Sequence, residues 1–312
     1  MSAIGDRLLE RIGREGPVSV AAFMAEALFD PRDGFYATKN PIGAGEDFIT
    51  APVISQMFGE LIGLWCVQAW MDLGQPRPFR LAELGPGTGA MMADALRAAR
   101  AAPGLIDAVD VTLVEASAAL KMVQGRTLTP AGVMTGWADR IESVPAGPAV
   151  ILGNEFLDCL PVRQAVKSGG AWRERMVGLD PEDPARLAFG TGPVLSPEDA
   201  ALIAPALRDA ADGSLAEIRP DLTARVDFAS LAAAAREAGL DVHGPVTQAQ
   251  FLSQMGIEVR AAALLRANPD RKQEIARQLW RLTDGEQMGS LFKVIALSSP
   301  GLPAPPGFDA HG

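Results

Sequence analysis

Residues 79–90 read FRLAELGPGTGA, and this stretch decides the fold. A short, mostly apolar run ends beside the acid Glu83, and glycines follow at alternate positions, Gly85, Gly87 and Gly89. The next residues, MMADALRAAR, have the composition of a helix. Glycine backbones can adopt positive φ and approach a ligand closely, and a helix start offers unpaired N–H groups. The stretch therefore predicts a strand, a tight turn and a helix start that bind a nucleotide-like cofactor.

Two acids at strand ends help to choose the cofactor. Gly85, Gly87 and Ala90 also satisfy the G-x-G-x-x-G/A dinucleotide fingerprint, so a nicotinamide cofactor is one alternative. Glu83, however, precedes the glycines directly, where its carboxylate can accept a hydrogen bond from the ammonium group of S-adenosylmethionine. Glu115 ends the next predicted strand, where ribose hydroxyls need an acceptor in either cofactor. The tighter spacing of the glycines and the position of Glu83 favour S-adenosylmethionine.

Apolar runs and helical stretches alternate around this loop. We expect strands at 79–84, 109–115, near 132–137 and at 148–153, separated by helices at 88–101 and 117–126. Such alternation is typical of a parallel sheet with right-handed crossovers. Outside this α/β core we expect a long apolar helix at 54–73, a hairpin of Val162–Lys167 and Trp172–Leu179, a helix at 197–211, a short strand at Leu215–Ile218, helices at 227–238, 248–255, 258–267 and 271–282, and a final strand at Leu291–Leu297.

Composition excludes several classes of function. The 312 residues contain 28 Lys and Arg against 38 Asp and Glu, a formal net charge of −10. Because phosphate contacts dominate nucleic-acid affinity, we expect no nucleic-acid partner. The 2 cysteines are too few for a disulfide framework. With only 2 histidines as well, the sequence argues against a zinc site or a histidine-based triad. Acids in the first amphipathic segment and the lack of a long apolar stretch predict no membrane span and a cytoplasmic location.

A second polar cluster follows the strand at 148–153. Asn154, Glu155 and Asp158 come directly after it. Ligands of open parallel sheets bind at the carboxyl ends of strands, so these side chains are expected to face the reactive end of the cofactor. The alternative is structural: Asn154 caps a short helix, and the two acids favour its N-terminus. The residues alone do not favour either the functional or the structural interpretation.

Motifs spread over nearly the whole chain carry a family resemblance. They are GPV at 16–18, FM at 23–24, DP at 30–31 with GFY at 34–36, DFITAP at 47–52, ISQ at 54–56 with FGEL at 58–61, ELGPGTG at 83–89, VE at 114–115, NEFLD at 154–158, DLTA at 221–224 with VDF at 226–228, TQ at 247–248 with FL at 251–252, and MG at 288–289 with LFKV at 291–294. By these motifs the chain resembles the MidA-type (DUF185) proteins. Mitochondrial members of that family are complex I assembly factors that methylate arginine in a partner subunit.

The resemblance implies a class I, Rossmann-like methyltransferase that uses S-adenosyl-L-methionine. It implies an arginine-bearing protein substrate, such as a respiratory complex I subunit. Its cofactor-binding residues would be Glu83, Gly85, Gly87, Gly89 and Glu115. Methylation of an arginine then requires carboxylates that grip the guanidinium and accept its proton; Glu155 and Asp158 are the catalytic candidates for these tasks, with Asn154 in an orienting role. The loop at 47–52 would form a lid in which Asp47 is a further candidate. A homodimer is an additional expectation.

The chain departs from the family pattern at Pro220–Asp221, where two flanking motifs are joined directly. The absent piece is at least one helix-plus-strand unit, on the order of 30 residues or more. We expect its loss to remove the fifth strand of the sheet, so that the fourth strand either pairs with the final strand or exposes an edge. In addition, Val53 stands where relatives usually have Glu. These departures support an alternative function, a non-catalytic assembly or binding protein that retains the methyltransferase fold.

Four divisions of the chain follow from these patterns. Residues 1–75 form a helical N-terminal substrate or lid region, and 76–220 form the cofactor-binding core with a hairpin insertion. Residues 221–298 supply a helical region and the closing strand of the core. Residues 299–312, rich in Pro and Gly, form a flexible tail.

Overall fold

The structure, a computed structural model, describes residues 3–38, 50–102, 104–203, 207, 209–218 and 228–308. Its contacts divide the chain into two compact units. The first unit combines Met1–Lys39 with Glu155–Leu231, and the second combines Asn40–Asn154 with Ala232–Gly312. These units cut across the divisions expected at 75/76 and 220/221, because segments far apart in the sequence pack together.

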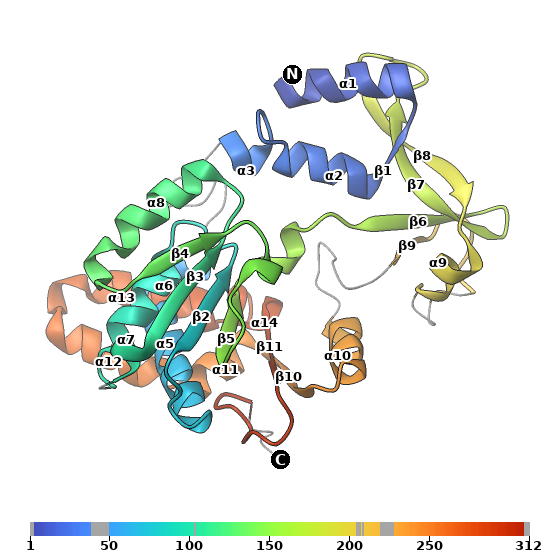
Figure 1. The fold of residues 1–312 in the computed structure, drawn as a ribbon. Helices are drawn as coiled ribbons and strands as arrows, with labels where there is room; N and C mark the ends of the chain where they lie inside the picture. Colours follow the sequence, from blue (N-terminus) through green and yellow to red (C-terminus); the bar gives the residue numbers. More distant parts are fainter. Residues whose placement is uncertain are drawn as a thin grey trace. The chain divides into compact units, whose positions relative to one another are not determined.

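The second unit contains the predicted parallel sheet. Its strands are β2 (Phe79–Leu84), β3 (Val109–Val114), β4 (Thr135–Ala138) and β5 (Ala149–Gly153). All neighbours are parallel in the order β4-β3-β2-β5, which confirms the α/β prediction (Figure 1). Leu84 pairs with both Val114 and Gly153, so the carboxyl ends of three strands lie at one level. This edge of the sheet carries the predicted cofactor residues.

Helices α5 (Gln56–Asp72) and α6 (Ala90–Ala99) pack against each other with little space between their backbones. A Cβ added at Gly63 would lie 2.4 Å from the Ala95 carbonyl oxygen, so only glycine allows this approach. The buried residues between these helices and the sheet include Cys66, Trp70, Phe79, Leu81, Met92, Leu96, Val111 and Leu113. Because strand residues two apart share a face, Phe79 and Leu81 both enter this core.

The remaining elements of the second unit come from both ends of its sequence. Before the sheet lies α4 (Ala51–Ile54), and between its strands lie α7 (Leu105–Ala108) and α8 (Ala118–Leu128). After Ala232 come the rest of α10 (Phe228–Glu237), then β10 (Asp241–Thr247), α11 (Gln248–Gln254), α12 (Ile257–Ala267), α13 (Lys272–Thr283), α14 (Met288–Leu291) and β11 (Lys293–Ser298). Strand β10 was not expected, because its Gly244-Pro245 pair is a strand-breaking signal.

Strand β5 lies at the edge of the four-stranded sheet. Among the described residues it pairs with β2 alone, whereas β11 pairs antiparallel with β10 in a separate two-stranded sheet. Ile151, in the middle of β5, is 49% exposed. Among the described residues, β5 thus has one unpaired edge, and the internal deletion itself stays a prediction. The Pro220–Asp221 junction itself lies outside the described residues.

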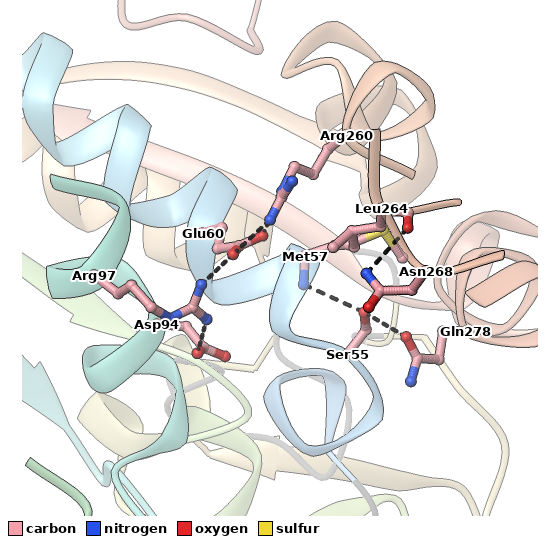
Figure 2. A network of polar contacts seen from close by, with 9 residues as sticks. All are labelled: Ser55, Met57, Glu60, Asp94, Arg97, Arg260, Leu264, Asn268 and Gln278. Carbon is pink, nitrogen blue, oxygen red and sulfur yellow. Dashed lines mark hydrogen bonds and ion pairs between the residues drawn. The ribbon is translucent and has the colours of Figure 1, made fainter. Parts of the chain in front are cut away.

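A buried carboxylate joins three helices of the second unit. Glu60 on α5 is 4% exposed and accepts two hydrogen bonds from Arg260 on α12, at 2.7 and 2.9 Å. Arg97 on α6 bonds to the same carboxylate and to Asp94 (Figure 2). Burial alone would raise the pKa of Glu60, but the two guanidinium groups outweigh it and lower that pKa. The carboxylate therefore ties α12 to the helices that cover the sheet.

The first unit is built on an antiparallel sheet. Its elements are α1 (Ala3–Glu15), β1 (Val18–Ser19), α2 (Val20–Phe29), α3 (Phe35–Thr38), β6 (Arg163–Ser168), β7 (Ala171–Leu179), β8 (Leu187–Val194), α9 (Pro197–Ala201), β9 (Leu215–Ile218) and the start of α10. The sheet order is β1-β7-β6-β9, with β8 also pairing with β7. The β6–β7 hairpin was predicted, but β8 was not. The helix expected at 197–211 is shorter, since α9 ends at Ala201.

The segment expected to be a flexible tail makes specific contacts as far as residue 308. The Pro306 carbonyl oxygen accepts a 3.1 Å hydrogen bond from the indole of Trp65, and the ring of Phe308 lies 5.5 Å from that of Phe251. Burial of an aromatic ring offsets the entropy of ordering the chain end. Within the described part of the chain, none of the helices has the length and apolar character that crossing a membrane requires.

Candidate functional site

The glycine loop has the backbone that its sequence predicts. Gly85, Gly87 and Gly89 have φ of 59°, 53° and 80°, all in the left-handed region. Residues with a Cβ rarely adopt this region, so the glycines are required for the turn. The loop is fixed by hydrogen bonds from Gly85 N to the Val114 carbonyl at 3.0 Å and from Gly89 N to the Pro86 carbonyl at 2.8 Å. Gly89 then forms the N-cap of α6, where amide groups are available for a ligand.

Glu83 is a buried carboxyl group with an unsatisfied oxygen. It is 3% exposed, and its Oε2 has no hydrogen-bond partner among the described residues. Burial raises its pKa from 4.5 to about 8, so the group is largely neutral at pH 7 in this structure. A buried acceptor without a partner is costly. A ligand that brings an N–H donor, and above all a cationic one, would remove this cost.

Glu115 follows β3 and is only partly buried. Its Oε1 accepts a 2.8 Å hydrogen bond from Ser117 N, and its Oε2 accepts one of 3.1 Å from Gln124 Nε2. Burial raises its pKa, and these hydrogen bonds oppose the rise. Each oxygen retains a lone pair, so the oriented carboxylate can still accept hydrogen bonds from the hydroxyl groups of a ligand.

The third predicted group follows strand β5 in the sequence. Asn154 is the last residue of the Asn40–Asn154 segment of the second unit and comes directly after Gly153, which pairs with Leu84. Glu155 is the first residue of the Glu155–Leu231 segment of the first unit and has a φ of 49°, an uncommon value for a residue with a side chain. Asp158 lies in a short 3-10 turn, Leu157–Cys159. The N-cap of that turn is Phe156, so the alternative in which Asn154 caps a helix is wrong.

Two residues that the sequence did not single out hold this segment within the first unit. The hydroxyl of Tyr36 donates to Cys159 Sγ at 3.1 Å. The Cys159 thiol in turn lies 3.6 Å from the Glu155 carbonyl oxygen and 3.7 Å from Asp158 Oδ1, both within donating distance. Burial raises the pKa of both the Tyr36 hydroxyl and the Cys159 thiol, so both remain protonated donors at neutral pH. These contacts restrain the backbone at Glu155 and the side chain of Asp158.

Gln124 is a further residue that the sequence did not single out. It lies in α8, is 0% exposed and contacts both Glu115 and the glycine loop. The only available signal was a glutamine within a helix, which carries no functional meaning by itself. Asp47 and the first half of the expected lid, residues 47–49, lie outside the described residues, whereas Thr50 forms the N-cap of α4 and the next two residues of the motif begin that helix. The described residues contain no group of three or more His, Cys, Asp or Glu arranged to hold a metal ion.

Curated relatives are similar to almost the entire chain. The protein arginine methyltransferase NDUFAF7, mitochondrial, of Danio rerio is 32% identical over 361 residues, covering 93% of this chain and 85% of the relative. The Homo sapiens protein of the same name is 31% identical over 362 residues, covering 93% and 82%. Both alignments are longer than this 312-residue chain, so they contain gaps on its side.

A solved structure has the same fold. A COG1565 superfamily member from Burkholderia thailandensis, bound to S-adenosyl-homocysteine, superposes with a TM-score of 0.82 at 26% identity. The match covers 99% of this chain and 95% of that chain. Its ligand is S-adenosylmethionine without the transferred methyl group, and the buried Glu83 oxygen and the glycine turn fit such a ligand. The nicotinamide alternative is therefore set aside in favour of S-adenosylmethionine.

The comparisons correct one expectation. A cytoplasmic location was expected from the acids of the first segment, yet the curated relatives are named as mitochondrial proteins. The acids of Ala3–Glu15 belong to a folded amphipathic helix whose residues Leu8 and Ile12 are buried in the first unit. The pattern of acids and apolar residues in this segment therefore reflects the packing of a helix, and it does not indicate the cellular location of the protein.

A family profile matches residues 61–221, which contain the glycine turn, both strand-end acids and the 154–158 segment. With this match and the relatives described above, the chain belongs to the family of S-adenosyl-L-methionine-dependent methyltransferases.

Proposed function

We propose that this chain methylates an arginine side chain of a partner protein, with Glu83, the glycine loop and Glu115 holding S-adenosylmethionine. The buried Oε2 of Glu83 carries the cofactor part of the proposal, because no donor among the described residues bonds to it and the ammonium of the ligand supplies one. The names of the curated relatives, protein arginine methyltransferases, support the substrate part.

Each cofactor residue has a distinct task in this proposal. Glu83 accepts a hydrogen bond from the ammonium group, and the nearby positive charge favours its ionised form. Gly85, Gly87 and Gly89 let the backbone approach the ligand, and Glu115 accepts hydrogen bonds from the ribose hydroxyls. When bound, the cofactor supplies an electrophilic methyl group on a sulfonium.

The substrate side requires two carboxylates. An arginine side chain is cationic at any working pH, and its planar fork of N–H donors matches a carboxylate in a bidentate pair. One acid orients the guanidinium, and one accepts the proton that the attacking nitrogen must lose, which contributes typically ~10²–10⁴-fold to the rate. We assign these tasks to Glu155 and Asp158, with Asn154 orienting the guanidinium through its amide.

The family resemblance extends the proposal to the partner. It implies a respiratory complex I subunit as the substrate and, by the names of the curated relatives, a mitochondrial setting. We also propose that the gaps in those alignments include a helix-plus-strand unit missing at Pro220–Asp221, which fits the unpaired edge of β5.

Methyl transfer to isolated complex I subunits tests the activity. The chain is incubated with S-adenosylmethionine labelled in the methyl group, and the labelled protein is hydrolysed to its amino acids. Labelled methylarginine is the expected product. Its absence, when calorimetry shows that S-adenosyl-homocysteine binds, would instead support the non-catalytic binding protein that the missing unit suggests.

Two variants test the assignment of the acids. Glu155→Gln and Asp158→Asn should each slow methyl transfer, the one that removes the base by about 10²–10⁴-fold. Affinity for S-adenosyl-homocysteine should stay unchanged in both, because neither acid is assigned to the cofactor. Glu182→Gln, at an exposed acid of the same unit, is the matched control. Normal transfer by both variants would refute the assignment.

A further inference from the structure

Gln124 connects the two parts of the proposed cofactor site. Its side chain is completely buried and donates from Nε2 to the Gly87 carbonyl oxygen at 2.9 Å and to Glu115 Oε2 at 3.1 Å. Its Oε1 accepts a 2.9 Å hydrogen bond from Trp137 Nε1. One amide therefore links the glycine loop, the acid after β3 and strand β4.

The direction of this amide is determined by its neighbours. An indole N–H can only donate, so the group facing Trp137 must be the carbonyl oxygen of Gln124. The NH₂ group then faces Gly87 and Glu115, which both present acceptors. The opposite orientation would place an NH₂ group against an N–H and a carbonyl against a carboxylate. Only one orientation satisfies all three contacts.

This orientation has a consequence for each partner. Glu115 is held at both oxygens, by Ser117 N on one side and by Gln124 on the other. The Gly87 carbonyl is held toward Gln124, and in a trans peptide the following N–H, that of Thr88, points the opposite way. The carboxylate and the loop amide are thus oriented before any ligand arrives.

We propose that Gln124 is a positioning residue that orients the Glu115 carboxylate and the glycine loop for the ribose end of the cofactor. The inference rests on the proposed function, since it takes Glu115 as the acceptor for the ribose hydroxyls. Affinity gained from a fixed acceptor depends on its preorganisation, because a mobile carboxylate must be ordered when the ligand binds. Loss of Gln124 leaves Glu115 held at Oε1 by Ser117 N but removes the hydrogen bond that fixes Oε2.

A pair of ligands isolates this effect. Calorimetry gives the dissociation constants of 5′-methylthioadenosine and of its 2′,3′-dideoxy counterpart, and their ratio reports the contribution of the ribose hydroxyls. Hydrogen bonds to a charged group predict a ratio of roughly 10–100 for the unmodified chain. We expect Gln124→Leu to reduce the ratio to about 3 or less, and Glu115→Gln to reduce it similarly. A purely structural role would weaken both ligands in parallel and leave the ratio unchanged.

Two further variants keep the test decisive. Trp137→Phe removes the donor that orients the amide and should reduce the ratio partially, even if Gln124→Leu fails to fold. Met122→Ala, on the same helix at a 65% exposed position, should leave the ratio unchanged. An unchanged ratio in folded Gln124→Leu, or in Trp137→Phe if the leucine variant is unfolded, would overturn the inference. If the unmodified chain shows no preference for the hydroxylated ligand, the ribose site at Glu115 is itself wrong.

Discussion

Ligand binding should release a proton from Glu83. In this structure the buried carboxyl has a pKa of about 8, against 4.5 for the exposed group, so at pH 7 about nine molecules in ten hold it protonated. An ammonium placed against its unpartnered oxygen stabilises the carboxylate. A cation within hydrogen-bond distance lowers an acid's pKa by about 1–3 units. The ionised fraction at pH 7 should then rise from about one tenth to between one half and nearly all.

The expected release is therefore about 0.4–0.9 proton for each S-adenosyl-homocysteine bound at pH 7. Calorimetric titrations in buffers of different ionisation enthalpy measure this number directly. The ligand's own amine also titrates near neutral pH, so Glu83→Gln is the matched control: it retains the shape of the side chain and releases no proton of its own. Equal proton release by the two proteins would refute the assignment of Glu83 to the ammonium.

The same group affects stability without ligand. Glu83 is protonated in both states below pH 4.5, and above that pH only the unfolded chain ionises, so the free energy of unfolding falls as pH rises toward 8. Each pKa unit corresponds to about 1.4 kcal/mol, which gives a total loss of about 5 kcal/mol. Urea denaturation from pH 4.5 to 8.5 should show a steeper decline in the unmodified chain than in Glu83→Gln, and the difference between the two profiles is the contribution of Glu83. Parallel profiles would contradict a buried, neutral Glu83.

Two other predictions concern the packing of the second unit. Arg260→Ala should lower the free energy of unfolding by about 1.5–3 kcal/mol at pH 7, because it removes two hydrogen bonds to the buried Glu60 carboxylate. The pKa of Glu60 is lowered in the fold, so the ionised carboxylate stabilises the fold above the ordinary carboxyl pKa, and this stabilisation disappears as pH falls. The loss of unfolding free energy in Arg260→Ala, measured by urea denaturation, should therefore become smaller in acid. A loss that is the same at every pH would argue against the ion pair. Gly63→Ala should cost about 1–3 kcal/mol in a thermal or urea unfolding experiment, because its Cβ would lie 2.4 Å from the Ala95 carbonyl oxygen and the helices must separate. At Gly74 a Cβ meets nothing within 4 Å but φ is +81°, so Gly74→Ala measures backbone strain without any contact between helices.

Much of the cofactor site was predictable because its signals are local. An apolar run that ends in an acid, followed by glycines at alternate positions, requires a strand and a left-handed turn whatever the rest of the chain does. Because parallel strands end at one edge of the sheet, the positions of Glu83 and Glu115 at that edge followed from the same pattern. The burial of Glu83, which determines its pKa, did not follow, since it depends on helix α5 packing over the sheet.

Strands with weak local signals were missed. Strand β8, LAFGTGPV, contains two glycines and a proline, and β10 contains Gly244-Pro245. Residues of this kind normally interrupt strands, and here the pairing with β7 and β11 decides the conformation. The short α9 shows the converse, because a helical composition over 197–211 did not extend the helix beyond Ala201.

The sequence by itself determined the family, the cofactor class and the parallel arrangement of the central strands, because each can be read from short motifs or from the alternation of apolar runs and helical stretches. Only the tertiary structure decided that residues 1–39 group with 155–231, that Glu60 bonds to Arg260, 200 positions away, and that Gln124 lies between the glycine loop and Glu115. Those features arise when distant segments bury one another's surfaces. The free energy of such burial depends on which distant segment packs against each surface, and the local hydrophobic pattern of a segment does not identify that partner.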